Sequence, residues 1–169
     1  MRIHPHHLQN QTSQPDNNIL LTLTTGVLLF IISQYILELI IKPHKRYNDI
    51  KSEVQNKVKF YAGVITSPLV FEAGKTENDS VVKNYMEASK EIRKLSCDLE
   101  SIYYSVPKFI RNIFIKENEE AVLEAASLLI RLSNSLYVFP YSNSPSQGLS
   151  NHDDLEKIKI NLNLSRKSA

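Results

Sequence analysis

The segment LSNSL contains the residues whose types come nearest to a nucleophilic site: Ser133 and Ser135, with Asn134 between them. A catalytic serine needs a general base within hydrogen-bond reach and an oxyanion site, commonly on a strained turn. These serines instead fall inside a helical period, and the histidines after the apolar run are His44, next to that run, and His152, in a polar segment. We therefore predict that the three residues cap or hydrogen-bond where their helix packs and ends, and we assign no catalytic residue and no enzymatic activity.

Cys97 is the sole cysteine of the chain. A single cysteine excludes an intramolecular disulfide and a zinc site of several thiolates, and it fits a reducing compartment. Because Cys97 lies beside the apolar stripe of its helix, we predict a small core residue and not a thiolate nucleophile.

Two groups of residues are candidate metal ligands. His4, His6 and His7 carry imidazoles, which are good ligands, but the amino-terminal copper arrangement needs histidine at position 3, and Pro5 interrupts a helical face. The acidic residues near Cys97 lack a Glu-x-x-His pattern, so we predict a solvated face instead of a di-metal site. Those acids are Glu87, Glu91, Asp98 and Glu100. Without zinc spacing, P-loop or dinucleotide fingerprint, the sequence predicts no metal and no cofactor.

Length and charge narrow the class of protein. The 169 residues allow one modest domain once the apolar run and the polar ends are set aside. Lysine and arginine total 20 against 18 acids, a net charge of +2. This near balance gives no reason to expect nucleic acid as a partner.

The apolar run near the start of the chain is long enough to cross a bilayer. From Ile19 to Leu37 the sequence has 19 positions without a charged residue, which as a helix reaches roughly 28 Å, about the thickness of the hydrocarbon core. A signal peptide would have basic residues before a shorter run and a small-residue cleavage site, and neither is present here. The sequence therefore predicts a transmembrane helix over 18–41.

Basic residues set the predicted orientation, since lysine and arginine are retained on the cytoplasmic side. Arg2 is the one arginine or lysine before the run. The basic residues after it are Lys42, Lys45, Arg46, Lys51, Lys57 and Lys59. We expect the carboxyl side in the cytoplasm and residues 1–17, which are polar and contain two prolines, as a disordered extracytoplasmic tail.

Several polar residues fall within or beside the predicted span. Glu38 lies one helical turn before Lys42, so an ion pair can offset its desolvation, and we interpret it as an interface residue; an intramembrane proton or partner site is the alternative. Small and hydroxyl-bearing residues would let a second helix approach closely, although there is no GxxxG pair. They are Thr22, Thr24, Thr25, Gly26 and Ser33.

Residues 42–139 have the pattern of a helical domain. Apolar residues recur at three- and four-residue steps from Tyr47 to Ile65 and again from Val82 to Val106. Gly74 and its polar neighbours predict a loop between the two helices. Asn78 or Asp79 would cap the second helix, and Asn118 would cap a third. The core face of this third helix consists of Val122, Ala125, Ala126, Leu129, Leu132 and Leu136. Between them, residues 108–115 predict either a short helix that closes the base of the bundle, which we favour, or an amphipathic element that touches the inner leaflet.

The carboxyl-terminal part reads as a linker over 140–151, rich in proline, serine and asparagine, and a short helix over 152–164, followed by a tail over 165–169. Asn151 or His152 would cap that helix. Alternation of Ile158, Ile160, Leu162 and Leu164 also fits a strand, and the segment could fold back on the bundle or detach for docking. The predicted fold class is all-α: an N-terminal transmembrane helix and a small antiparallel cytoplasmic helical bundle.

Four features together resemble a group of uncharacterised bacterial single-span membrane proteins whose helical cytoplasmic domain ends in an LSNSL-type motif. They are the N-terminal span, YMEASKEIRKLSCDL, YYSVP and EAASLLIRLSNSL, within residues 20–137. Where such chains often read IGLSNSL, this chain has Arg131 in place of glycine. The resemblance implies a bacterial inner-membrane setting and brings no catalytic residue with it.

Three functions follow as hypotheses. The first is a membrane-anchored helical interaction module, whose partners are the lipid bilayer and a protein at the membrane or in the cytoplasm, with homo-oligomerisation left open. The second is a membrane-acting effector or toxin-like component, as in a phage-defence system, suggested by the threonine-rich span and the apolar segment KFIRNIFI. A hydrolase or transferase with scattered site residues is the weakest reading.

Overall fold

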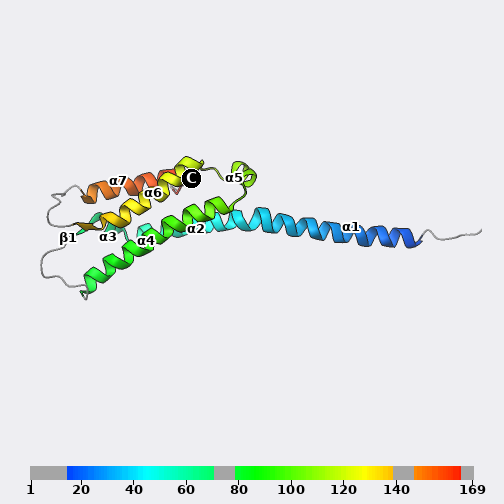
Figure 1. Cartoon of the computed structure of the whole chain (residues 1–169), viewed down its shortest axis with the longest axis horizontal. Helices are drawn as coiled ribbons and strands as arrows, with labels where there is room; N and C mark the ends of the chain where they lie inside the picture. Colours follow the sequence, from blue (N-terminus) through cyan, green and yellow to red (C-terminus); the bar gives the residue numbers. More distant parts are fainter. Residues whose placement is uncertain (1–14, 71–78, 139–146, 165–169) are drawn as a thin grey trace, which may run out of the picture. The chain divides into compact units, whose positions relative to one another are not determined.

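The structure, a computed structural model, describes residues 15–70, 79–138 and 147–164 (Figure 1). The chain divides into two compact units, one up to Glu38 and one from Leu39 onward. The described residues are helical apart from turns and two short strands, β1 (Leu69–Val70) and β2 (Tyr137–Val138), which pair in parallel with Leu69 opposite Tyr137. The prediction of an all-helical chain with one long apolar helix near its start is confirmed.

The first unit consists of helix α1 (Pro15–Ile36), which therefore begins before residue 18. Its apolar side chains lie on every side of the helix and all are exposed, from Ile19 to Ile36. A helix without a polar stripe does not lie on the surface of a soluble domain. Helical residues from Asn18 onward are long and apolar enough to cross a membrane.

Helical structure does not end at Ile41. A stretch of π-helix, η1 (Leu37–Ile41), follows α1 and is followed directly by α2 (Lys42–Phe60). Pro43 lies in the first turn of α2 and has no N–H to donate to the carbonyl group of Leu39. A local widening of the helix to the π form accommodates such a loss.

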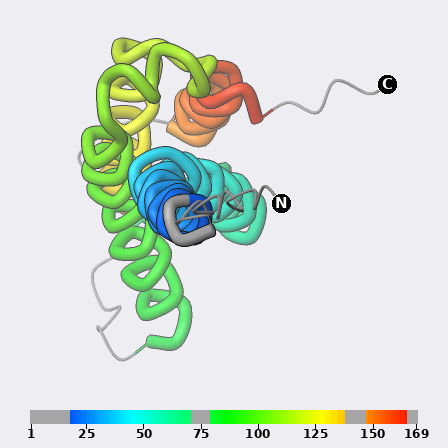
Figure 2. Tube along the Cα trace, turned by 90° about the vertical axis from the view of Figure 1, so that its right-hand side faces the viewer, coloured from blue at the N-terminus to red at the C-terminus, as the bar shows by residue number. Residues whose placement is uncertain are grey.

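The second unit is built from α2, α3 (Ala62–Thr66), α4 (Ser80–Ser105), α5 (Lys108–Phe114), α6 (Glu119–Ser135) and α7 (Gln147–Asn161). Helix α6 lies between α4 and α7, and α2 packs on α4 (Figures 1 and 2). Helix α3 packs on α7. The α5 helix and the β1–β2 pair lie at opposite ends of this unit (Figure 1).

The core of the second unit consists of the predicted apolar stripes. On α4 the stripe packs against α2 on one side and α6 on the other, and Leu99 is fully buried at its centre. Its buried residues include Tyr47, Ile50, Val54 and Val58 of α2, Val82, Ile92, Leu95 and Leu99 of α4, Val122, Leu129 and Leu132 of α6, and Leu155 and Ile158 of α7.

Two predicted N-caps are confirmed. The carboxylate of Asp79 accepts a hydrogen bond from the backbone N–H of Val81 at 2.9 Å, at the start of α4. The side chain of Asn118 accepts one from the N–H of Ala121 at 2.7 Å, at the start of α6. Each cap satisfies one of the N–H groups that a helix start leaves without a partner.

The predicted boundaries of the last helix are wrong. Helix α7 begins at Gln147, inside the segment read as a linker, and ends at Asn161. Asn151 is therefore no cap: it lies within the helix and is fully buried. Leu162 and Leu164 follow the helix and are also buried, so this segment folds back on the bundle. The sequence suggested a cap at Asn151 because asparagine is common at helix starts. Its actual hydrogen-bond partners, Ile65 and Ser135, lie far away in the sequence.

The predicted placement of Cys97 is also wrong. Its side chain is exposed, whereas its neighbour Ser96 is buried and donates a hydrogen bond to the carbonyl of Ala126 at 2.7 Å. Ser96 faces α6 in place of Cys97 because a small hydroxyl group can donate a hydrogen bond to a backbone carbonyl where two helices approach closely.

Candidate functional site

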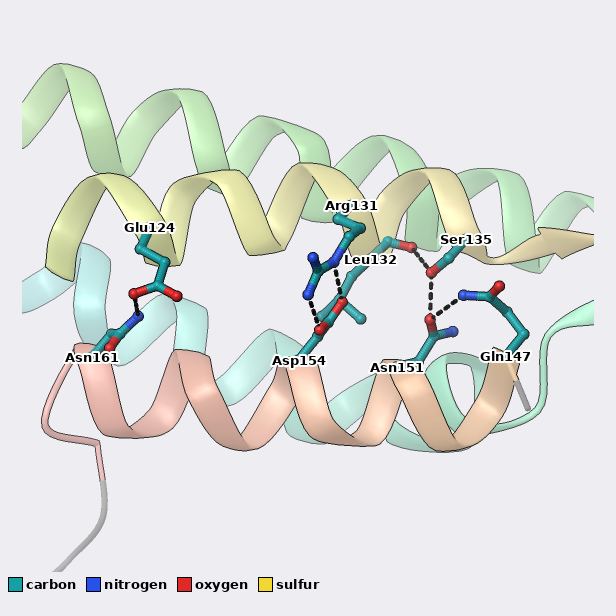
Figure 3. Close-up of polar contacts among 8 residues, drawn as sticks. All are labelled: Glu124, Arg131, Leu132, Ser135, Gln147, Asn151, Asp154 and Asn161. Carbon is teal, nitrogen blue, oxygen red and sulfur yellow. Dashed lines mark hydrogen bonds and ion pairs between the residues drawn. The ribbon is translucent and has the colours of Figure 1, made fainter. Parts of the chain in front are cut away.

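The residues of LSNSL bond to both neighbouring helices: Ser133 and Asn134 contact α4, and Ser135 contacts α7 (Figure 3). Ser135 Oγ lies 2.6 Å from Asn151 Oδ1 and 3.0 Å from the carbonyl oxygen of Leu132. Ser133 Oγ donates to the carbonyl of Ile130 at 2.8 Å, and Asn134 accepts a hydrogen bond from Arg93 of α4. These contacts confirm the prediction that the motif hydrogen-bonds where its helix packs.

Asn151 is the centre of this network. Its Nδ2 donates to the carbonyl oxygen of Ile65 in α3 at 2.8 Å, and its Oδ1 accepts from Ser135 and, at 3.0 Å, from Gln147 Nε2 (Figure 3). A fully buried amide whose donor and acceptor are both used fixes one arrangement of three helices.

Arg131 binds the carboxylate of Asp154 through two nitrogens (Figure 3). Arg131 Nε lies 2.6 Å from Asp154 Oδ2, and the second contact joins Nη2 to Oδ1. The carboxylate is buried while the guanidinium reaches the surface. The planar guanidinium presents two donors that match the two carboxylate oxygens, so Arg131 connects α6 to α7.

A second polar cluster joins the start of α2 to the segment before α6. The carboxylate of Glu117 is buried and pairs with Lys51. It also accepts a hydrogen bond from Asn163 at 3.1 Å, and Tyr47 Oη lies 3.4 Å away. Burial alone would raise the pKa of Glu117, but the hydrogen bonds from Lys51 and Asn163 hold it below its ordinary value of 4.5. Burial, followed by the charge of Glu117, raises the pKa of Tyr47.

Beside this cluster is a cavity of about 300 Å³ at the α5 end of the unit. Arg111 lies over the rings of Tyr103 and Tyr104, with its guanidinium carbon 4.7 and 5.3 Å from their centroids. One of its nitrogens, Nη1, is buried and has no hydrogen-bond partner among the described residues; Glu119 lies 3.8 Å from it. Lysines and acids share the remaining wall, which is lined by Lys108, Asn112, Ile115, Lys116, Glu117 and Asn118.

Helix α5 buries only one of its apolar side chains deeply. Ile110 is 1% exposed, whereas Ile113 is 70% exposed. We call the exposed apolar residues Phe109, Ile113 and Phe114 the α5 apolar face. Ile110 therefore packs into the core, as the bundle interpretation predicts, and the α5 apolar face is left uncovered by the described residues; contact with the inner leaflet stays a prediction.

The other candidate residues do not gather into a site within the described part of the chain. His4, His6 and His7 lie outside the described residues. No group of three His, Cys, Asp or Glu side chains that could hold a metal ion occurs in the described ranges. Glu91 pairs with Lys57 at 3.1 Å, and His44 Nε2 lies 3.0 Å from Asn48 Nδ2.

Sequence reasoning missed Glu117, Asn151 and Asp154 as interaction residues. Each is a polar residue beside an apolar position, a pattern shared by many solvated residues. The one available signal was Arg131, a cation between Ile130 and Leu132 in the apolar period of its helix, for which an acidic partner is expected.

No family model matches the chain, and neither a curated protein nor a solved structure is similar to it.

Proposed function

We propose that the chain is a membrane-anchored helical interaction module, with residues 18–41 crossing the bacterial inner membrane and the helices from α2 onward in the cytoplasm. The observation that carries the proposal is the uniform exposure of the apolar residues of α1. Lipid is the solvent in which such a surface is stable, since its backbone groups are all satisfied within the helix.

The charges beside the apolar run support the orientation. Lys45 and Arg46 are exposed at the start of α2, and lysine and arginine next to a span stay on the cytoplasmic side. The bacterial setting comes from the resemblance of the sequence to single-span membrane proteins and is part of the proposal.

The second unit is proposed to be an antiparallel bundle that presents a surface to a protein partner. Contacts between α6 and α7 support the antiparallel arrangement, because Glu124 bonds Asn161, Arg131 bonds Asp154 and Ser135 bonds Asn151. The polar residues that could serve catalysis are used in such contacts, which favours binding over chemistry.

A swap of the anchor tests this proposal. The chain would be expressed with its own span, with an unrelated single-pass span of the same orientation, and without a span. Crosslinking in cells should recover the same partner for both anchored forms and much less for the free form, since tethering raises the local concentration near a membrane partner. Loss of the partner on exchanging the span alone would contradict the proposal.

The effector hypothesis predicts the opposite result, because the span itself would act on the membrane and could not be exchanged. The hydroxyls of Thr22, Thr24, Thr25 and Ser33 each donate to the carbonyl four residues earlier, at 2.8 Å. Satisfied in this way, they need no second helix, which favours the anchor. A membrane-potential dye distinguishes the two: depolarisation that depends on the native span, without a stable partner, would support the effector.

A further inference from the structure

The α5 apolar face lies beside the residues that follow the proposed span. The ring of Phe114 is 6.0 Å from the ring of His44, centroid to centroid. His44 is only three residues after Ile41, a rise of about 4.5 Å along a helix. Within the same unit, Ile40 of the apolar run packs against the core. The fold of the second unit therefore holds α5 beside the residues at which the apolar run ends and α2 begins.

With the proposed anchor, those residues follow the span within the cytoplasmic headgroup region. The polar zone on each side of a bilayer is about 5–7 Å deep beyond the hydrocarbon. A segment about 4.5 Å beyond the end of the span lies inside this zone. The three exposed apolar side chains of the α5 apolar face are thus within reach of headgroups and upper acyl chains.

The charges around α5 are complementary to anionic lipid. Lys108 and Lys116 flank the helix, are exposed, and form no ion pair with the described residues. Lys45 and Arg46 lie on the neighbouring start of α2 and are exposed as well. Basic residues beside exposed apolar ones are typical of elements that lie in the interface of an anionic membrane.

From these observations we propose that α5 is a second membrane contact: Phe109, Ile113 and Phe114 insert into the cytoplasmic leaflet, and Lys108 and Lys116 bind anionic headgroups. This inference rests on the proposed anchor. Two contacts restrict the rotation of the bundle about its span, so the same surface always faces the cytoplasm.

Depth-dependent quenching tests the contact in the full-length chain in vesicles. An environment-sensitive dye is attached to Ile113→Cys in a Cys97→Ser background. Two matched positions serve as controls: Leu29→Cys within the span, and Phe60→Cys, which is equally apolar and 76% exposed but lies at the far end of α2. Quenchers are a lipid with a spin label high on its acyl chain and aqueous iodide.

The dye at Ile113 should be quenched by the spin-labelled lipid and shielded from iodide, and the dye at Phe60 should show the reverse. Quenching at Leu29 by lipid reports the anchor separately. If the dye at Ile113 behaves like that at Phe60 while Leu29 is quenched by lipid, the α5 contact is wrong and the anchor stands. Shielding of Ile113 from both quenchers means that protein covers α5, which also overturns the contact. Absence of lipid quenching at Leu29 contradicts both proposals.

Lipid charge supplies the second arm. Changing from zwitterionic vesicles to vesicles with about 30% anionic lipid should increase lipid quenching at Ile113 by about twofold. The pair Lys108→Gln and Lys116→Gln should abolish that increase. The control pair Lys83→Gln and Lys94→Gln, on exposed positions of α4, should keep it, and equal behaviour of the two pairs would contradict the role of the two lysines.

Discussion

Asn151 of α7 donates a hydrogen bond from its side-chain amide to the backbone carbonyl of Ile65 at 2.8 Å, and both groups are buried. The bond connects residues that are 86 positions apart in the sequence. Because Ile65 lies in the short helix α3, this amide adds a polar bond to the packing between α3 and the start of α7.

Replacing Asn151 with aspartate should destabilise the second unit by about 1–3 kcal/mol, because the carbonyl of Ile65 loses its donor and a carboxylate is buried beside it. Urea unfolding followed by tyrosine fluorescence, with hydrogen exchange of α7, measures the effect. Asn161→Ala is the matched control, because its bond to Glu124 lies at the surface; a change within about 0.5 kcal/mol is expected there. Equal effects of the two substitutions would refute the central role of Asn151.

The pair of Arg131 and Asp154 predicts a coupling between α6 and α7. Arg131→Ala should lower the free energy of unfolding by about 1–3 kcal/mol, because it leaves the buried carboxylate of Asp154 without its cation. The effect is smaller than for a fully buried pair because the guanidinium is partly solvated. Adding Asp154→Asn should recover part of that loss by removing the charge. A double-mutant cycle in urea measures the coupling. Strictly additive effects would show that the pair does not stabilise the contact.

Gly148 is required by a close backbone approach. A Cβ at this position would lie 2.3 Å from the carbonyl oxygen of Thr66, a backbone atom. Gly148→Ala should therefore displace the first turn of α7 and speed hydrogen exchange there. Gly63→Ala meets no atom within 4 Å and lies in a helix, so it should be neutral or up to about 1 kcal/mol stabilising. Hydrogen exchange in α7 as slow in Gly148→Ala as in the native chain would show that the close approach to Thr66 does not require glycine.

Glu117 should make stability depend on pH. In the folded state burial raises the pKa of its carboxyl, but hydrogen bonds from Lys51 and Asn163 lower it, and the pKa lies below 4.5. A lowered pKa contributes stability that is fully present above the unfolded value, about 4.5, and is lost as the pH falls through the folded pKa. Melting from pH 7 to pH 3 should show this loss in the native chain and less of it in Glu117→Gln. The same acid dependence in both proteins would exclude Glu117 as its source.

The helices themselves could be predicted from the sequence because their signals are local. The stripes of α2, α4 and α6 have helical spacing, and Asp79 and Asn118 stand where caps are expected. The long apolar helix was likewise predicted from composition alone. Hydrophobic period and capping depend on neighbours a few residues away, so one sequence contains that information.

The contacts between helices could not be predicted in the same way. The start of α7 was placed too late because Asn151 has the composition of a cap, whereas Ile65 and Ser135, its partners, are far away in the sequence. We predicted Cys97 in the core because it lies beside an apolar stripe. A small rotation of the helix about its axis is enough to move such a residue from the core to the solvent. The α5 apolar face could not be predicted because a seven-residue helix with apolar residues on several sides does not determine from its own sequence which side packs on the core.

The most direct test of the central claim uses the one native cysteine. Cys97 is exposed on α4, so a membrane-impermeant maleimide should label the full-length chain in inverted inner-membrane vesicles but not in intact spheroplasts. A Ser13→Cys substitution in a Cys97→Ser background should give the opposite pattern, and both proteins should stay in the membrane after alkaline extraction. Labelling of Cys97 in intact spheroplasts, or release of the chain by alkali, would contradict a membrane-anchored protein with a cytoplasmic helical unit.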